Sequence, residues 1–144
     1  MPGPMTKERL QKYRSIKKEY RQIQGLLDEI EAQVYSPAQP QMTGMPGARS
    51  AESGSAQERR SDRTRELRDR YRAKLDELAA EQLAIEEAIE TLDPDARLVL
   101  RHHYITGYKW EEVCNLIPCS WRTVHRIHSR ALQQLAKIEK APED

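Results

Sequence analysis

The chain has 144 residues, of which 33% are charged and 6% aromatic, and it contains no phenylalanine. This length and composition exclude a large enzyme built around a thick apolar core, and they favour long helices with narrow apolar stripes. The net charge of +1 conceals a strong segregation of charge along the sequence.

Charge is distributed in three blocks. Residues 58–74 contain eight basic and four acidic side chains, a net charge of +4, and residues 75–92 contain six acidic side chains and no basic one, a net charge of −6. Residues 118–138 contain four basic side chains and no acidic one, again +4. Because a local patch matters more for nucleic-acid binding than the total charge, the basic blocks are candidate contact surfaces. For residues 58–74, a solvated charged helix is the alternative to a phosphate-binding surface.

The apolar pattern predicts neither a membrane span nor a secretion signal. The longest uncharged apolar run is far below the roughly 20 residues of a membrane span, and the N-terminus is already charged at Lys7, Glu8 and Arg9. The two cysteines, Cys114 and Cys119, are typical of a reducing compartment rather than of a disulfide scaffold. We therefore expect a cytoplasmic protein without membrane contact.

The first predicted element is a helix over residues 6–34. Apolar side chains recur there every three or four residues, which marks one face of a helix. They are Leu10, Tyr13, Ile16, Tyr20, Ile23, Leu27, Ile30 and Val34. Residues 35–54 follow with three of the eight prolines and three of the six glycines, and this composition predicts a flexible linker.

A second long helix is predicted over residues 55–92, starting where Ser55 and Glu58 have the spacing of a capping box. Its apolar stripe approaches a heptad repeat with one polar exception, Gln82. The stripe is Leu67, Tyr71, Leu75, Leu78, Gln82, Ile85, Ile89 and Leu92. Neither helix can bury its stripe alone. An antiparallel hairpin within the chain is the favoured solution, and a coiled coil with a second copy, giving a homodimer, is the alternative.

Asp93-Pro94 predicts the start of a third helix, because Asp can cap the first turn and Pro fits its first position. This helix covers residues 94–106, and Gly107 ends it. Its inward side chains are Val99, Leu100 and Ile105.

Two further helices are predicted over residues 109–117 and 120–139, joined by a tight turn at Pro118 and Cys119. Ser120 is a natural N-cap for the second of them. The inner face of that helix carries Val124, Ile127, Ala131, Leu132 and Leu135, and its outer face carries Arg122, His125, Arg126, Ser129 and Arg130. A short helix that braces a basic helix has the shape that enters a DNA major groove.

The expected fold is thus all-α. Residues 1–92 would form a helical hairpin or coiled coil with its linker, and residues 93–144 a three-helix, helix-turn-helix DNA-binding domain.

Several short motifs in the C-terminal part carry a family resemblance. They are the Tyr-x-x-Gly at Tyr104–Gly107, the Glu-Glu-Val at Glu111–Val113, Ser120, the pair Thr123-Val124 and the Arg-Ala-Leu at Arg130–Leu132. Together they resemble region 4 of bacterial sigma factors, which reads the −35 promoter element. The turn departs from that pattern, because Pro118 stands where Gly is usual, and Lys109 stands where Ser or Thr is common.

A narrower resemblance rests on Trp110 before the double Glu, on Arg126–His128, and on Ser36-Pro37 and Gly44–Pro46 in the linker. These features resemble phage and prophage late-transcription regulators of the RinA and ArpU type. The resemblance implies a regulator in the bacterial host cytoplasm that activates phage late genes. It would bind double-stranded promoter DNA and assist the host RNA polymerase.

The resemblance and the position on the last helix together predict the DNA contacts. Side chains expected at base edges are Trp121, Arg122, His125 and Arg126, and those expected at phosphates are Lys109, Ser120, Thr123 and Arg130. Packing of Trp121 into the core and a merely exposed His125 are the alternatives. Trp110, Val113 and Ile127 are assigned to the core.

The sequence contains no clear pattern for metal binding or catalysis. Cys114, Cys119, His125 and His128 come close to a zinc spacing without matching it, and neither a phosphate-binding loop nor a nucleophile–base pair is recognisable. We expect no metal, no cofactor and no enzymatic activity. Two alternative functions remain: a small terminase-like DNA-packaging protein, and a sigma-like protein-interaction adaptor.

Overall fold

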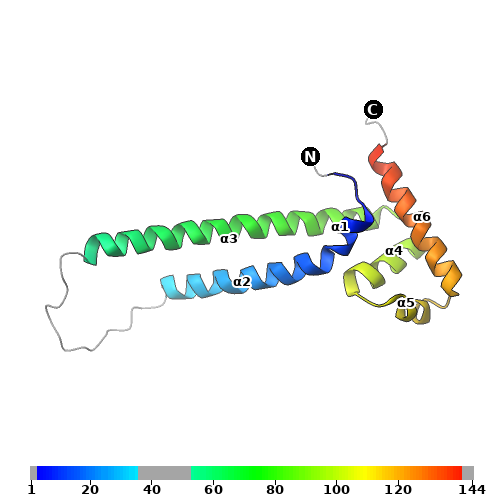
Figure 1. Cartoon of the computed structure of the whole chain (residues 1–144), viewed down its shortest axis with the longest axis horizontal. Coiled ribbons are helices and arrows are strands. Elements are labelled where there is room, and N and C mark those ends of the chain that lie inside the picture. The colour runs from blue at the N-terminus through cyan, green and yellow to red at the C-terminus, as the bar shows by residue number, and fades with distance from the viewer. Residues whose placement is uncertain (1–2, 36–52, 141–144) are drawn as a thin grey trace. The chain divides into compact units, whose positions relative to one another are not determined.

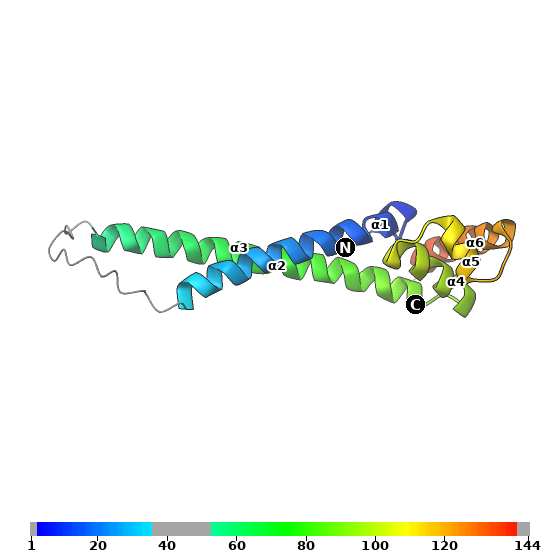
Figure 2. The same cartoon turned by 90° about the horizontal axis from the view of Figure 1, so that it is seen from below.

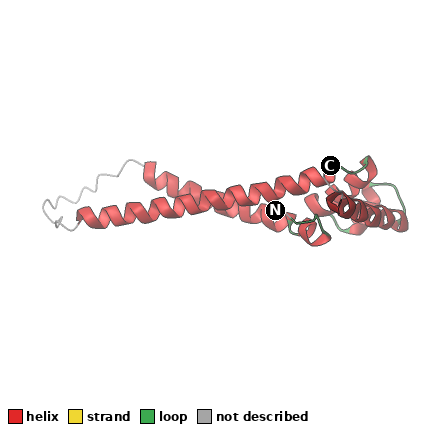
Figure 3. Ribbon diagram, turned by 90° about the horizontal axis from the view of Figure 1, so that it is seen from above, coloured by secondary structure: helices red, strands yellow, loops and turns green. Residues whose placement is uncertain are grey.

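The computed structural model describes residues 3–35 and 53–140, and every element in this part is a helix (Figure 3). The expected all-α fold is therefore confirmed. The helices are α1 (Lys7–Gln11), α2 (Tyr13–Tyr35), α3 (Ser53–Glu90), α4 (Pro94–Leu100), the π-helix η1 (Arg101–Thr106), α5 (Trp110–Leu116) and α6 (Trp121–Lys140) (Figure 1). Of the predicted linker, residues 36–52 lie outside the described residues.

The N-terminal helix differs from its prediction, because it is divided at Lys12 into α1 and α2. Thr6 caps α1 by accepting a hydrogen bond from the Arg9 N–H at 3.3 Å. The Lys12 N–H then donates to the Arg9 carbonyl at 3.1 Å, a three-residue closure that tightens the last turn of α1. The apolar spacing continues through this break, so the pattern alone predicted one helix.

The start of α3 also differs from its prediction. The helix begins at Ser53, two residues before the expected cap at Ser55, so the Ser55–Glu58 spacing lies inside the helix. The prediction of a capping box there is wrong. At 38 residues α3 is about 57 Å long.

Contacts divide the chain into two compact units, one of residues 20–77 and one of residues 1–19 with 78–144. In the first unit, α2 and α3 run side by side in opposite directions (Figures 1 and 2). Ile23, Leu27 and Leu75 are buried there, and Arg72 Nη2 lies 2.7 Å from Glu31 Oε1. The two helices thus pack against each other within this unit.

Leu67 departs from the predicted apolar stripe of α3, because its side chain is 41% exposed. Since Glu31 pairs with Arg72, the last residue of α2, Tyr35, falls near residue 68 of α3. The first turns of α3 therefore extend past the end of α2. They contain most of the basic block, including Arg59, Arg60 and Arg63.

The second unit has one apolar core, to which the two ends of the sequence both contribute. Met5, Leu10 and Tyr13 come from the N-terminal segment, and α3 adds Ile85 and Ile89. The remaining members are Leu92, Ala96, Val99, Leu100, Tyr104, Val113, Val124, Ala131 and Leu135. The N-terminal segment is thus part of the core beneath the C-terminal helices. The domain boundary predicted between residues 92 and 93 is based on the helix start at Asp93-Pro94, and it stays a prediction.

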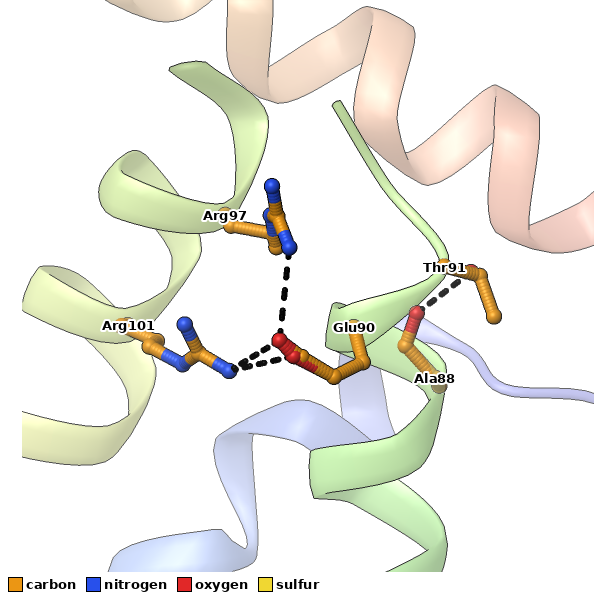
Figure 4. A network of polar contacts seen from close by, with 5 residues as sticks. All are labelled: Ala88, Glu90, Thr91, Arg97 and Arg101. Atoms are coloured by element: carbon orange, nitrogen blue, oxygen red, sulfur yellow. Dashed lines mark hydrogen bonds and ion pairs between the residues drawn. The ribbon is translucent and has the colours of Figure 1, made fainter. Parts of the chain in front are cut away.

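The junction between α3 and α4 is held by polar contacts (Figure 4). Asp93 caps α4 as predicted, since its Oδ1 accepts from the Ala96 N–H at 3.1 Å. Glu90 accepts hydrogen bonds from Arg97 at 3.3 Å and from Arg101 at 3.2 Å. The Arg101 guanidinium, with Arg97, holds the pKa of the Glu90 carboxyl below its usual value. The junction thus joins the end of α3 to the first helix of the C-terminal part.

The predicted helix over residues 94–106 changes its winding halfway. α4 passes directly into η1, where the His102 carbonyl accepts from the Gly107 N–H at 3.1 Å and from the Tyr108 N–H at 2.9 Å. Gly107 ends this segment, as predicted, in the left-handed conformation with a φ of 91°. The wider turn of a π-helix has no signature in apolar spacing, so the sequence did not predict it.

Candidate nucleic-acid interface

The two helices α5 and α6 pack against one core, to which each contributes a fully buried valine. Val113 of α5 and Val124 of α6 are both 0% exposed. Trp110 and Ile127 pack against the same core as half-buried side chains. The assignment of these residues to the core is confirmed.

The turn between α5 and α6 has no left-handed residue. Ile117 leaves α5 in an extended conformation, with φ −104° and ψ 111°. This is the conformation that a following proline favours, because the Pro118 ring disfavours a helical residue before it. Pro118 thus replaces the usual glycine turn with an extended residue.

The two helices are capped in different ways. Ser120 Oγ accepts from the Thr123 N–H at 3.2 Å, and the two hydroxyl oxygens lie 2.9 Å apart. The predicted N-cap of α6 is therefore confirmed. At α5 the Lys109 ammonium cannot accept a hydrogen bond and so cannot cap the helix. Instead, Glu112 Oε1 accepts from the Lys109 backbone N–H at 3.3 Å.

The outer face of α6 presents a row of arginines to solvent. Arg122, Arg126 and Arg130 are exposed, and they form no ion pair with a described residue. They recur every four residues, which keeps them on one side of the helix. Trp121 stands at the start of this row with 53% of its surface exposed. Its packing into the core is therefore not observed.

His125 is less exposed than its place on the outer face predicted. Its ring lies between two indoles, with centroids 4.9 Å from Trp110 and 4.3 Å from Trp121. Its Nε2 is buried and has no hydrogen-bond partner among the described residues. The His125 ring therefore packs against the Trp121 indole, and it lies next to the row of arginines.

Three histidines surround Trp110, a cluster that sequence reasoning missed. The His103 ring stacks on the indole at 3.8 Å, and the His128 ring lies 4.6 Å away. His128 is 7% exposed, and its Nε2 forms a 2.6 Å hydrogen bond with the Tyr104 hydroxyl. The residues come from η1, α5 and α6, so only the tertiary fold brings them together.

Burial sets the protonation of this cluster. It lowers the pKa of His128 to about 4, with the positive charge of Lys7 acting in the same direction. Burial also lowers the pKa of His103 and raises the pKa of the Tyr104 hydroxyl to about 12. His128, His103 and the Tyr104 hydroxyl are therefore uncharged near neutral pH.

The N-terminal segment reaches this region with one side chain that the sequence did not single out. Arg14 of α2 lies over Gly107, and with Lys109 it lines a depression of about 210 Å³. Arg14 and Gly107 are 93 residues apart in sequence, so no local pattern could have predicted their contact.

No cluster of three or more His, Cys, Asp or Glu side chains suited to a metal occurs among the described residues. Cys114 and Cys119 are half-buried free thiols. Within the same residues, no helix is both long and apolar enough to cross a membrane.

Two helices packed against one apolar core, with a solvated cationic face on the second, form a helix-turn-helix. Residues 82–135 match the family model of sigma-70, region 4. The matched segment begins in the last turns of α3 and ends at Leu135 in α6. This part of the chain is thus a sigma-70 region 4-like domain, a kind of DNA-binding domain. Comparisons with curated proteins and with solved structures gave no match.

Proposed function

We propose that this protein is a sequence-specific transcription regulator that binds promoter DNA through α6 and assists bacterial RNA polymerase. The observation that carries the proposal is the exposed arginine row of Arg122, Arg126 and Arg130, which lies on the second helix of the region 4-like domain. The domain belongs to a class that acts on promoters, so transcription is the process it fits best. Activation of phage late genes is the finer form of this proposal, and it rests on the resemblance of the short motifs.

The proposed contacts with bases and with phosphates come from different positions on α5 and α6. Arg122 and Arg126 are near the N-terminal end of the helix, where side chains reach base edges, and an arginine can pair with both O6 and N7 of guanine. Trp121 offers an exposed ring to a thymine methyl group or a sugar, and His125 supports that ring. Arg130 lies one turn beyond Arg126, and Lys109 lies at the start of α5. We expect both side chains to contact phosphates.

Ser120 and Thr123 have a double role in this proposal. The Ser120 hydroxyl already caps α6 and is hydrogen-bonded to the Thr123 hydroxyl, and Ser120 is exposed at the end that would approach the DNA backbone. Because one of the two hydroxyls donates to the other, the second keeps its O–H free to donate to a phosphate, so such a contact does not require the cap to open.

Base reading is tested by selecting binding sites from a random duplex library with the full chain. The change Arg126→Ala is then compared with Arg130→Ala at constant salt. We expect Arg126→Ala to relax the preference at one base pair, at a cost of about 1–3 kcal/mol, whereas Arg130→Ala weakens binding to all sequences evenly. Lys137→Ala is the control for loss of one charge, because Lys137 is exposed and lies eleven residues after Arg126 on α6. If the library yields no preferred sequence, specific DNA binding is contradicted.

The role in transcription has its own test. Purified RNA polymerase is assayed on a template that carries the selected site upstream of a promoter, with and without the protein. We expect more transcript with the wild-type chain and no increase with Arg126→Ala. Unchanged or reduced transcript with the wild-type chain would contradict activation. Light scattering separates the packaging alternative, for which a ring of many subunits is expected.

A further inference from the structure

The contact between Arg14 and Gly107 places a cation from the N-terminal segment beside the helix-turn-helix. A Cβ built on Gly107 would overlap the Arg14 guanidinium and would lie 2.7 Å from its Nη1. The guanidinium thus rests directly on the backbone of residue 107, in a space that a side chain would otherwise fill. Both residues belong to the same compact unit.

The depression beside this contact has the character of an anion site. Its lining includes Gln11 and Arg14 from the N-terminal helices, and His103, Gly107, Tyr108 and Lys109 from the C-terminal part. It contains two cationic side chains and no carboxylate. Arg14 and Lys109 are exposed, and neither side chain forms an ion pair with a described residue. Their charges are therefore available to a ligand.

We propose that Arg14 and Lys109 together bind one phosphate of the DNA backbone in this depression. The inference rests on the proposed function, in which the first helix of the pair, α5, crosses the backbone while α6 enters the groove. Lys109 stands at the start of α5, so a phosphate passing there meets the Lys109 ammonium and the Arg14 guanidinium from two sides. Arginine binds phosphate oxygens through two parallel N–H groups, which suits an anchoring contact.

The proposal extends the DNA-binding surface beyond the region 4-like domain. Residues 82–135 would supply base reading and part of the phosphate contacts, and the N-terminal segment would supply a clamp on the adjacent backbone. A phosphate contact carries no sequence information. The clamp would therefore set affinity and register on the duplex but not the preferred bases.

The first experiment measures binding of the full chain to its selected duplex across a series of salt concentrations. Arg14→Gln is compared with wild type and with Lys12→Gln, which removes an exposed charge from the same region but outside the depression. For Arg14→Gln we expect about tenfold weaker binding and a slope of log K against log salt reduced by about 0.9, the value for one lost phosphate contact. The base preference should be unchanged. For Lys12→Gln we expect the wild-type slope.

The second experiment identifies the phosphate. Single backbone phosphates of the duplex are replaced in turn by neutral methylphosphonates, and binding of wild type and Arg14→Gln is measured to each duplex. We expect one substitution that weakens wild-type binding about tenfold and has little effect on Arg14→Gln, because the two changes remove the same interaction. Lys109→Gln should lose sensitivity at the same position.

The results separate this inference from the proposed function. If wild type selects a sequence and Arg14→Gln retains its affinity, its salt slope and its full sensitivity at every phosphate, then the clamp is overturned and the proposed function stands. If wild type binds DNA without preference but Arg14→Gln weakens it, the clamp stands and base reading fails. Circular dichroism of Arg14→Gln is expected to match wild type, because the side chain is exposed.

Discussion

His128 shows how a single side chain links burial to solution conditions. It is 7% exposed, and it bonds to the Tyr104 hydroxyl within the core of the helix-turn-helix. A neutral imidazole can keep this bond with either tautomer, but a charged imidazolium would place a positive charge in an apolar environment. The pKa of His128 is accordingly lowered by burial to about 4, from 6.5 for an exposed histidine.

We expect the protein to lose stability as pH falls from about 6.5 to about 4. Between these values the unfolded chain binds a proton at residue 128 and the folded chain does not. The contribution of neutral His128 to the free energy of unfolding is therefore complete above pH 6.5 and declines below it, by at most about 3 kcal/mol. Burial of His103 lowers the pKa of its ring and adds an effect of the same sign. Urea unfolding at a series of pH values measures the change.

The variant His128→Gln isolates the contribution of this ring. Glutamine keeps a polar partner for Tyr104 and cannot be protonated, so its unfolding free energy should vary less over the same pH range. An identical pH dependence in the variant and in wild type would show that His128 does not titrate on unfolding.

At the scale of elements, two glycines, Gly107 and Gly25, have opposite roles. Gly107 ends η1 with a φ of 91°, which side chains disfavour, and the Arg14 guanidinium occupies the position of its absent Cβ. Gly25 lies inside α2, is exposed, and has nothing within 4 Å of a Cβ built on it. A glycine is thus required at the end of η1 and is a source of flexibility within α2.

We expect Gly107→Ala to destabilise the fold and Gly25→Ala to stabilise it. The first change should cost about 1–2 kcal/mol for the left-handed backbone alone, with a further loss from displacing Arg14. The second should gain about 0.5–1 kcal/mol, because alanine is the better helix former. Thermal and urea unfolding of the two variants check the signs. Equal effects at both positions would contradict this difference.

Which elements could be predicted from the sequence depended on how local their signals were. The Asp93-Pro94 start, the Gly107 end and the Ser120 cap each involve a few adjacent residues, and all three are confirmed. The break at Lys12 and the π-turns of η1 leave the apolar spacing almost unchanged, so the pattern did not distinguish them from a regular helix.

The candidate site divides in the same way. The exposed arginines of α6 follow from helical periodicity, which depends on one helix only. The histidines around Trp110 and the Arg14–Gly107 contact need residues far apart in sequence, and only the fold provides these contacts.

At the scale of the whole molecule, the N-terminal segment and the helix-turn-helix share one core. Leu10 is 0% exposed within the same cluster as Val113 and Val124. Both tryptophans of the chain, Trp110 and Trp121, lie in the helix-turn-helix. Their fluorescence therefore reports the unfolding of this part alone.

We expect Leu10→Ala to lower the stability reported by the tryptophans by about 2–5 kcal/mol, because it leaves a cavity in the shared core. Leu27→Ala removes an equally large buried side chain from the unit of residues 20–77, and it should affect the tryptophan signal less. Urea unfolding followed by fluorescence makes the comparison. A tryptophan transition that Leu10→Ala leaves unchanged would show that the helix-turn-helix folds without the N-terminal segment.

The extended turn before Pro118 has a consequence for the entropy of DNA recognition. A proline ring removes one backbone rotation, and the residue before it loses most of its helical states, so fewer conformations are available to this turn than to a glycine turn. Much of the ordering of α5 against α6 is thus achieved when the chain folds, before any DNA is present. A binding surface ordered in advance gives up less freedom on association, and more of each contact energy then appears as affinity.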